Sequence, residues 1–518
     1  MKNLPNLLPR PVEIRPDSGI FEILPDTVIF HDCAEARPAA RLLAEQLRPA
    51  TGYVLSVEEG APRCPNDIAL ELSQDAPPES EGYSLHVTEN GASLKARSAA
   101  GLFYATQTLR QLFPVEIFQP SVVSRKWEIP GLAIRDFPRF EWRGMHLDVS
   151  RHFRPKEDVL KFIETISSLK FNRFHWHLTD DQGWRIEIKK YPRLTEIGAW
   201  RDGTLIGHQS QDPANIAYDG VRHGGFYTQE DVRKIVAFAS EHHVTILPEI
   251  DMPGHMQAAV ASYPERGCTE TPVTVRKEWR SEHVLNTEES TVEFCKDILS
   301  EILDLFPGHA IHVGGDEVKK QEWEASARIQ QLRCERGLKD MDEMQSWFLR
   351  QIQKFLVAKG RHLVGWDEIL EGGLDGDLTI MAWRNDERGR IAVKTGHPTV
   401  IASKNYYFDF YQAEPVEKEP LAFGGFLPMK QVYAYNPIPQ DLTEAERGRI
   451  LGGQGQLWTE YMPTMEHVEY MAFPRCCALA ESLWLGETLK DYEDFVRRLP
   501  SFLKRLDAQG VNYCQCSG

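Results

Sequence analysis

The spacing of apolar positions changes at about residue 136. From there onward, short apolar stretches alternate with longer segments in which apolar residues recur every three or four positions. This alternation is typical of βαβ units. We expect strands at residues 142–149, 173–179, 245–250, 310–315, 362–367, 379–383, 399–403 and 453–458. Eight parallel strands with helices between them close a (β/α)8 TIM barrel, which we predict over residues 136–518.

The helical pattern is clearest at residues 156–169, 229–242 and 344–359. A last helix is expected at 465–483, where Pro474 should kink it. The connections after the second and third strands, at 191–227 and 252–286, are long enough to cover a site.

Residues 1–135 show a different pattern. Strand-like runs at 12–14, 27–30, 68–72, 83–87 and 92–96 are separated by Gly, Pro and Asp, and residues 97–113 have helical spacing. We predict a small N-terminal α+β domain here, with residues 122–130 as a linker into the barrel. The predicted fold class is therefore α/β, a (β/α)8 barrel preceded by a small α+β domain.

Polar and aromatic residues follow the expected strands at their C-terminal ends, where α/β barrels hold their active sites. In chain order these ends carry Arg151, Asp180, His255, Asp316 with Glu317, Trp366, Trp383, Tyr407 with Asp409, and Trp458 with Glu460. A single polar or aromatic residue at a strand end could have a purely structural role. Because all eight strand ends carry such residues and meet at one mouth, the sequence predicts a binding pocket there.

The fourth of these ends, HVGGDE at 312–317, is the most informative. Side chains alternate along a strand, so Asp316 and Glu317 would normally face opposite sides. Gly314 and Gly315 allow a bulge or kink that turns both carboxylates into one pocket.

Tryptophans, a tyrosine and carboxylates around one mouth indicate a sugar pocket, because aromatic rings pack on the apolar faces of sugars and charged groups bind hydroxyls. In the usual glycosidase scheme two carboxyls flank the scissile bond, about 5–5.5 Å apart for retention and roughly 6.5–9.5 Å for inversion. Neighbouring residues are awkwardly placed for that scheme. They suit a mechanism in which one acid protonates the leaving oxygen and the substrate supplies its own nucleophile.

The charge balance narrows the classes of partner. A net charge of −17 argues against nucleic acid or an anionic membrane, and no run of 18 apolar residues is present. The N-terminus, MKNLPNLLP, lacks the apolar core of a signal peptide. We expect a cytoplasmic protein, or a periplasmic or secreted one if an export signal was removed.

The nine cysteines include no CxxC pair, so a structural zinc site is not expected. Cys476 and Cys477, like Cys514 and Cys516, are too close for ordinary internal bridges. We expect free, mostly buried thiols, which weakly favour a reducing compartment.

Four segments together resemble glycoside hydrolase family 20, the β-N-acetylhexosaminidases. They are WRGMHLDVSRHF at 142–153, HWHLTDDQGW at 175–184, PEIDMPGH at 248–255 and HVGGDE at 312–317. The resemblance covers both domains, since the first is similar to the small domain that precedes this family's barrel. It implies substrate-assisted retention, in which the 2-acetamido group of the sugar is the nucleophile.

The resemblance also implies a role for each site residue. Glu317 would be the general acid and then the base, and Asp316 would hold the acetamide N–H and stabilise the oxazoline, with Asp180 and His255 as a relay behind Glu317. Trp366, Trp383 and Trp458 would surround the acetamide methyl and Tyr407 would bond its carbonyl oxygen. Arg151 would bind O3 and O4, and Asp409 and Glu460 would bind O4 and O6. No metal or cofactor is implied. The partner would be a glycan ending in β-linked GlcNAc or GalNAc, and a homo-oligomer stays open.

Other residues near the strand ends have structural interpretations. Packing is expected for His175, Trp176, His177 and Trp184. Asp181 is expected to brace a loop, and Asp148 and Asp367 fit either hydrogen-bond anchors or site residues. The family's additional aromatic, between strands seven and eight, has Tyr433 and Tyr435 as candidates.

Two alternatives come from different classes. A metal-dependent barrel hydrolase, suggested by HWH at 175–177, would need this motif on the first strand and further His or Lys ligands on the middle strands, where this chain has Trp. An inactive sugar-binding module would be expected to lose the acid, yet Asp316, Glu317 and Tyr407 are all present. The preference between GlcNAc and GalNAc, and the natural glycan, stay open at this stage.

Overall fold

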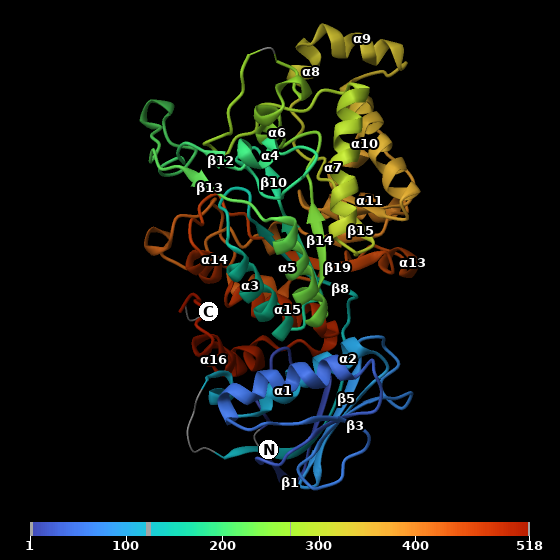
Figure 1. The fold of residues 1–518 in the computed structure, drawn as a ribbon, viewed down its shortest axis with the longest axis vertical. Coiled ribbons are helices and arrows are strands. Elements are labelled where there is room, and N and C mark those ends of the chain that lie inside the picture. The colour runs from blue at the N-terminus through green and yellow to red at the C-terminus, as the bar shows by residue number, and fades with distance from the viewer. Residues whose placement is uncertain (1–3, 121–125, 270, 516–518) are drawn as a thin grey trace.

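The computed structural model describes residues 4–120, 126–269 and 271–515, and Figure 1 shows two bodies stacked along the long axis of the molecule. The N-terminal domain, in blue, lies at one end and the barrel occupies the rest. Strand arrows of the barrel point away from the N-terminal domain, so the C-terminal ends of the strands face the opposite end of the molecule (Figure 1).

The N-terminal domain is built on a seven-stranded mixed sheet. Its strands are, in spatial order, β1 (Glu13–Ile23), β7 (Trp127–Asp136), β5 (Tyr83–Thr88), β6 (Gly91–Ala96), β4 (Ile68–Leu72), β2 (Ile29–His31) and β3 (Val57–Glu59). Helices α1 (Arg37–Thr51) and α2 (Ala99–Leu112) bury one face against this sheet and lie on the side toward the barrel (Figure 1). The α+β prediction is confirmed. It contained neither β3 nor α1, whose buried face is made mainly of alanines.

The predicted linker is wrong. Residues 127–136 form strand β7, which lies between β1 and β5 in the interior of the sheet. Pro130 is accommodated because β1 shifts its register opposite it. Gly131 is needed because a Cβ atom there would lie 2.2 Å from the carbonyl oxygen of Ser18. Residues 122–125 of the predicted linker lie outside the described residues.

The barrel prediction is confirmed. Eight parallel strands close on one another: β8 (Trp142–Asp148), β9 (Arg173–His177), β14 (Thr245–Glu249), β15 (Ala310–His312), β16 (His362–Trp366), β17 (Leu378–Ala382), β18 (Thr399–Ile401) and β19 (Ile450–Gly455). Each strand ends one to three residues earlier than predicted, and the fourth and eighth differ most. Trp458, predicted as the end of the eighth strand, lies beyond β19 and lines the mouth instead.

Helices cover the outside of the barrel, among them α3 (Lys156–Ser168), α5 (Gln229–Glu241), α7 (Glu289–Leu305), α10 (Met341–Ala358) and α11 (Asp386–Lys394). The connection after β16 begins with a short 3-10 helix, Asp367–Leu370. Pro474 does more than kink the last predicted helix. It separates α14 (Met465–Ala472) from α15 (Arg475–Trp484), because proline removes a backbone donor and its ring clashes with the preceding turn.

A buried carboxylate joins the two bodies. Asp136, the last residue of β7, accepts hydrogen bonds from Lys170 Nζ at 2.8 Å, Tyr83 Oη at 2.6 Å and Trp484 Nε1 at 2.8 Å. Lys170 and Trp484 belong to the barrel and Tyr83 to the sheet. Removal of Asp136 would leave the buried ammonium of Lys170 without its counter-ion and Trp484 Nε1 without its acceptor, so the contact fixes the two bodies against each other.

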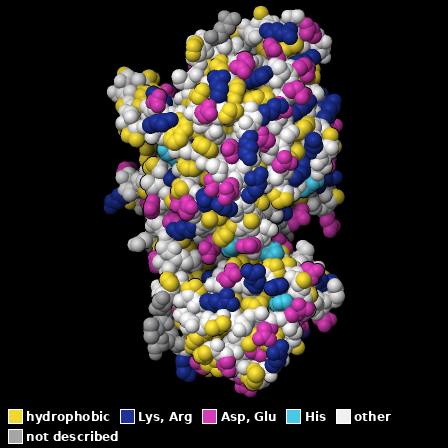
Figure 2. All heavy atoms as spheres, viewed as in Figure 1, with side chains coloured by type: hydrophobic (Ala, Val, Ile, Leu, Met, Phe, Trp, Pro, Cys, Tyr) yellow, Lys and Arg dark blue, Asp and Glu magenta, His cyan; other side chains and the backbone are white. Residues whose placement is uncertain are grey.

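Two expectations about composition can be compared with the structure. Seven cysteines of the described chain are free, as expected, whereas Cys514 is disulfide-bonded. Of the free ones only Cys295, Cys476 and Cys477 are buried, so the expectation of mostly buried thiols is wrong. Among the described helices, none combines the length and apolar composition that a bilayer span needs. Acidic and basic side chains are interspersed over the face shown in Figure 2.

Candidate active site

A cavity of about 430 Å³ opens at the C-terminal ends of the barrel strands. Every predicted site residue except Asp180 lines it, and Asp180 is buried behind the wall. These side chains come from all parts of the barrel sequence, between Arg151 and Glu460. The barrel therefore assembles the site by bringing its strand ends to one mouth, as the sequence predicted.

The glycine turn after β15 places the two acids. Gly314, Gly315 and Glu317 have φ of +64°, +90° and +46°, so the chain turns sharply in the left-handed region instead of continuing the strand. A Cβ atom on Gly314 would lie 1.7 Å from Asp251 Oδ1, and Gly315 N donates to the same oxygen at 3.1 Å. Glycine at 314 is thus required by its conformation and by its neighbour. Positive φ at Glu317 is backbone strain of the kind found at functional sites.

The two acids have opposite electrostatic environments. Asp316 is 8% exposed, and burial above all raises its pKa to about 6. The Glu317 side chain is 48% exposed, and the interaction with His255 lowers its pKa to about 2. Below pH 6 Asp316 and His255 are therefore both protonated, while Glu317 is ionised.

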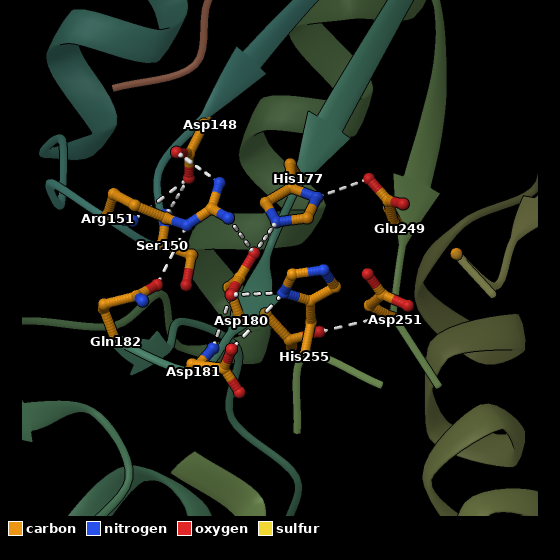
Figure 3. A network of polar contacts seen from close by, with 12 residues as sticks. Asp148, Ser150, Arg151, His177, Asp180, Asp181, Gln182, Glu249, Asp251 and His255 are labelled. Carbon is orange, nitrogen blue, oxygen red and sulfur yellow. Dashed lines mark hydrogen bonds and ion pairs between the residues drawn. The ribbon is translucent and has the colours of Figure 1, made fainter. Parts of the chain in front are cut away.

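His255 stands between the acid pair and the buried network drawn in Figure 3. Its Nε2 lies 3.5 Å from Asp316 Oδ2 and 3.6 Å from Glu317 Oε2, while Nδ1 lies 3.1 Å from Asp180 Oδ1. Burial disfavours the charged imidazole, but Asp180 and Asp316 outweigh burial and raise the pKa of His255 well above its ordinary value. His255 also has a positive φ, of +51°.

Asp180 is held by three cationic side chains (Figure 3). Its Oδ2 is 2.8 Å from Arg151 Nη2 and 2.9 Å from His177 Nε2, and its Oδ1 faces His255. Burial would raise the pKa of Asp180, but Arg151 and His255 outweigh it and lower that pKa well below its usual range. One buried carboxylate thus connects a predicted sugar-binding arginine to the imidazole beside Glu317.

His177 does more than the packing that the sequence analysis expected. It is buried inside the barrel as expected, but its Nδ1 also contacts Glu249 Oε2 while its Nε2 contacts Asp180. A ring that bridges two carboxylates is favoured as an imidazolium, and the pKa of His177 is raised well above its ordinary value because these charges outweigh burial. Only the fold reveals this contact, because Glu249 lies on the neighbouring strand.

Glu249 is the centre of a buried polar cluster. It accepts from Trp366 Nε1 at 2.8 Å, and it lies 2.8 Å from His312 Nδ1 and 3.0 Å from His175 Nε2. His175, Glu249 and His312 are close enough to hold a metal ion. The oxygens of Glu249 already have hydrogen bonds from Trp366 and His177, and the rings of His175 and His312 lie within ion-pair distance, which accounts for the cluster as a polar contact network.

Three tryptophans form an aromatic wall. The ring centroid of Trp366 lies 6.5 Å from that of Trp383 and 5.9 Å from that of Trp458. Trp383 Nε1 donates to Glu368 Oε2 at 2.8 Å, and Tyr407 Oη donates to the carbonyl oxygen of Trp383 at 2.9 Å. These bonds fix the orientation of the rings. No role was predicted for Glu368 from the sequence. Burial and the nearby Asp316 raise the pKa of this carboxyl to about 8.

The predicted hydroxyl-binding groups gather at the buried end of the cavity. Arg151 Nη1 lies 3.8 Å from Glu460 Oε1, and Arg151 Nε donates to Gln182 Oε1 at 2.9 Å. Burial raises the pKa of both Asp409 and Glu460. Asp148 is a hydrogen-bond anchor that accepts from the backbone N of Ser150 at 2.8 Å.

Asp367 and Asp181 act in the same structural way as Asp148. Asp367 Oδ2 accepts from Trp383 N at 3.0 Å, and Asp181 Oδ1 accepts from Gln257 N at 2.9 Å. Both carboxylates therefore hold backbone at the base of the mouth.

The expected additional aromatic wall is wrong. Tyr433 is buried and its hydroxyl meets Glu481 at 3.1 Å, while Tyr435 donates to Asp386 at 2.6 Å; neither lines the cavity. The outer wall is formed instead by residues to which the prediction gave no role: Gln209, Trp279, Arg280, Ser281, Lys319, Phe410 and Phe423. The length of the two connections after β9 and β14 was the only signal for the loop residues.

A (β/α)8 barrel whose mouth joins two carboxylates to an aromatic wall has the architecture of a glycoside hydrolase. Family comparison agrees. The model of the glycosyl hydrolase family 20 catalytic domain matches residues 140–487, and that of the family's domain 2 matches residues 4–137. The chain belongs to glycosyl hydrolase family 20, and it is a glycoside hydrolase of the β-N-acetylhexosaminidase type.

Individual relatives show the same similarity. A β-hexosaminidase of Porphyromonas gingivalis is 42% identical over 98% of this chain, which spans 64% of that relative's length. A solved family 20 β-N-acetylhexosaminidase from Streptomyces coelicolor A3(2) has a TM-score of 0.85 at 30% identity, covering 99% of this chain and 97% of its own. A solved family 20 exo-β-N-acetylglucosaminidase from Vibrio harveyi, in complex with N-acetylglucosamine, has a TM-score of 0.85 at 33% identity, covering 98% and 78%.

Proposed function

We propose that this protein is an exo-acting, retaining β-N-acetylhexosaminidase that releases terminal GlcNAc or GalNAc from glycans through an oxazoline intermediate. The observation that carries the proposal is the grouping of Asp316 and Glu317 around one nitrogen, His255 Nε2, beside the tryptophan wall. A carboxylate nucleophile must reach the anomeric carbon from the face opposite the acid. Two carboxylates gathered on one side do not achieve this. The acetamide of the substrate supplies the missing nucleophile.

In the first step, ionised Asp316 accepts the acetamide N–H and directs the carbonyl oxygen toward the anomeric carbon. The bond from that oxygen to the carbon forms as the glycosidic bond breaks, and Glu317 donates a proton to the leaving oxygen. Positive charge develops on the oxazoline ring, next to Asp316. A fixed charge in a buried site stabilises such a transition state more than the ground state.

The proton that Glu317 donates comes from His255 in this proposal. Before substrate binds, Glu317 is ionised because His255 lowers its pKa to about 2. A bound sugar removes water from Glu317, and desolvation raises the pKa of a carboxyl group. The imidazolium of His255, 3.6 Å away, then passes its proton to Glu317, while Asp180 holds the other ring nitrogen. Substrate binding in this way prepares the acid.

In the second step, ionised Glu317 takes a proton from a water molecule as that water attacks the anomeric carbon. The bond between this carbon and the acetamide oxygen breaks, the ring opens, and the acetamide is restored. Two inversions at one carbon give net retention of configuration.

The nucleophile is tested with a stable thiazoline analogue of the intermediate. It is expected to inhibit at least about 100-fold more tightly than free GlcNAc, because it resembles a species near the transition state. β-Glucosides should be very poor substrates, since they lack the acetamide. Inhibition constants and turnover on matched glycosides measure both effects. A covalent glycosyl ester trapped on any carboxylate with a fluorinated sugar, together with good β-glucosidase activity, would overturn the proposal.

The pH dependence follows from Asp316. Its pKa of about 6 governs kcat/KM, which reports the free enzyme. Below pH 6 the carboxyl gains a proton and loses the charge that stabilises the oxazoline, so kcat/KM is expected to fall about tenfold per pH unit. The profile of an activated aryl glycoside between pH 4 and 8 measures this limb. In Asp316→Asn the limb should disappear from the residual activity; its survival would assign it to another group.

A further inference from the structure

Carboxylates crowd around the imidazole of His255 (Figure 3). Its Nδ1 lies 3.1 Å from Asp180 Oδ1 and 3.4 Å from Asp181 Oδ2. Its Nε2 lies 3.5 Å from Asp316 Oδ2 and 3.6 Å from Glu317 Oε2. Asp180 has two further cationic partners, as described above. In the described part of the chain, the other three acids have no cationic side chain except His255 within ion-pair distance. The group therefore has an excess of negative charge.

Several buried oxygens in this group lack partners. Asp181 Oδ2, Asp251 Oδ2 and Asp316 Oδ1 are shielded from solvent and have no hydrogen-bond donor among the described residues. Asp251 is fully buried, and only its Oδ1 is engaged, by Gly315 N at 3.1 Å. Burying a charged group is costly unless it is paired, so the concentration of such oxygens indicates a place for a cation. The proposed mechanism has no use for the unpaired oxygen of Asp251.

The spacing of three groups fits a metal ion. One oxygen of Asp251, one ring nitrogen of His255 and one oxygen of Asp316 lie within 4.8 Å of one another. Zn²⁺ binds nitrogen and oxygen ligands at about 2.0–2.2 Å, so the ligand atoms of a tetrahedral site lie roughly 3.3–3.6 Å apart. The 3.5 Å between His255 Nε2 and Asp316 Oδ2 already matches this spacing. A small shift of the Asp251 carboxylate completes the set.

The surroundings of His255 also suit a metal ligand. Its Nδ1 faces Asp180, and a carboxylate on the far ring nitrogen orients an imidazole toward a metal and raises its basicity. His255 and Asp316 line the cavity, so an ion can enter from the mouth and keep a water molecule in its fourth position. The cluster around Glu249 lacks such access, because none of its three members lines the cavity.

We propose that Asp251, His255 and Asp316 form an inhibitory site for a divalent cation of the Zn²⁺ class. The cation takes the place of the proton on His255 Nε2, since a metal binds the neutral imidazole. It thereby removes the proton that Glu317 would receive and occupies the carboxylate that would hold the acetamide N–H. Cation and substrate therefore exclude each other. Binding of the cation stands on the geometry alone, whereas the inhibition rests on the proposed function.

Calorimetric titration of the full chain with Zn²⁺ measures the site directly. The protein used carries Cys64→Ser and Cys334→Ser, because these exposed cysteines offer thiolates to zinc. We expect this background protein to bind a single Zn²⁺ ion, which the thiazoline analogue displaces. Asp251→Asn in the same background should weaken binding about tenfold or more, since loss of even an outer partner of a metal ligand costs roughly 10–100-fold in affinity. Asparagine can still accept from Gly315 N.

The matched control for Asp251→Asn is Glu324→Gln, which also removes one negative charge but lies exposed on the surface, away from the cavity. It should bind Zn²⁺ as tightly as the background protein. Inhibition is measured on methyl β-N-acetylglucosaminide at several Zn²⁺ concentrations. KM should rise with free Zn²⁺ while kcat stays constant. A fall in kcat at constant KM would show that the ion acts at another place.

The outcomes separate the two proposals. If the protein binds Zn²⁺ as expected but hydrolyses no β-N-acetylhexosaminide, the proposed function fails and the cation site stands. If it hydrolyses them, yet Zn²⁺ binding survives the thiazoline or Asp251→Asn unchanged, only the cation site is overturned. Binding that disappears with the two exposed cysteines would also overturn it. Should Asp251→Asn prove unfolded by circular dichroism, displacement by the thiazoline decides the matter.

Discussion

Glu317→Gln is expected to lower kcat on methyl β-N-acetylglucosaminide by roughly 10²–10⁴-fold, the usual worth of a general acid, with little change in KM. The amide has nearly the same shape but can neither receive the proton of His255 nor pass it on. The first step on an activated aryl glycoside should suffer much less, because such a leaving group departs without protonation. Steady-state kinetics on both substrates measure the difference.

The matched control is Glu324→Gln on α8 (Gln321–Ala325), an exposed position near Glu317 in sequence and away from the cavity. It should retain wild-type kinetics. Equal losses on the methyl and aryl glycosides in Glu317→Gln would show that Glu317 does not act as the acid.

Asp316→Asn is expected to lower kcat by roughly 10²–10³-fold, which is the effect of removing one preorganised group that faces developing charge. An asparagine still accepts the acetamide N–H, so ground-state binding should persist. It has no charge to offer the oxazoline, so the loss belongs to the transition state and appears in kcat more than in KM. Burial sharpens the effect, since Asp316 is 8% exposed and water screens it little.

The measurement is the split between kcat and KM, supported by the thiazoline inhibition constant, which should weaken in parallel with kcat. A variant in which KM rises while kcat is retained would make Asp316 a binding residue and remove it from the proposed mechanism.

The Asp316–Glu317 pair illustrates how far the sequence reaches. Two glycines before two acids predicted a kink at a strand end, and the positive φ of Gly314 and Gly315 is that kink. The sequence could not provide the reason for glycine at 314, which is the side chain of Asp251. This residue follows the neighbouring strand β14, and its carboxylate occupies the space that a Cβ would fill. The residue type alone shows that glycine can adopt a positive φ. Which side chain lies next to it depends on the order of the strands in the barrel.

The errors have a common physical cause. Residues 122–130 were predicted to be a linker, yet Pro130 lies within strand β7, where a register shift in β1 accommodates it in the sheet. Tyr433 and Tyr435 were chosen for their place in the chain, but Phe423 and the distant Trp279 occupy the outer wall. In both cases contacts remote in sequence outweighed the local preference.

The sequence by itself determined the barrel and the identities of the groups around its mouth. Periodicity reports which faces are buried, and parallel strands must bring their C-terminal ends together. Only the tertiary structure decided how those groups are protonated. The pKa values of Asp316 and Glu317, about 6 and about 2, depend on burial and on the imidazole of His255. That ring is distant along the chain but adjacent in space. Electrostatic energy depends on distance and on exclusion of water, and neither quantity exists until the chain has folded.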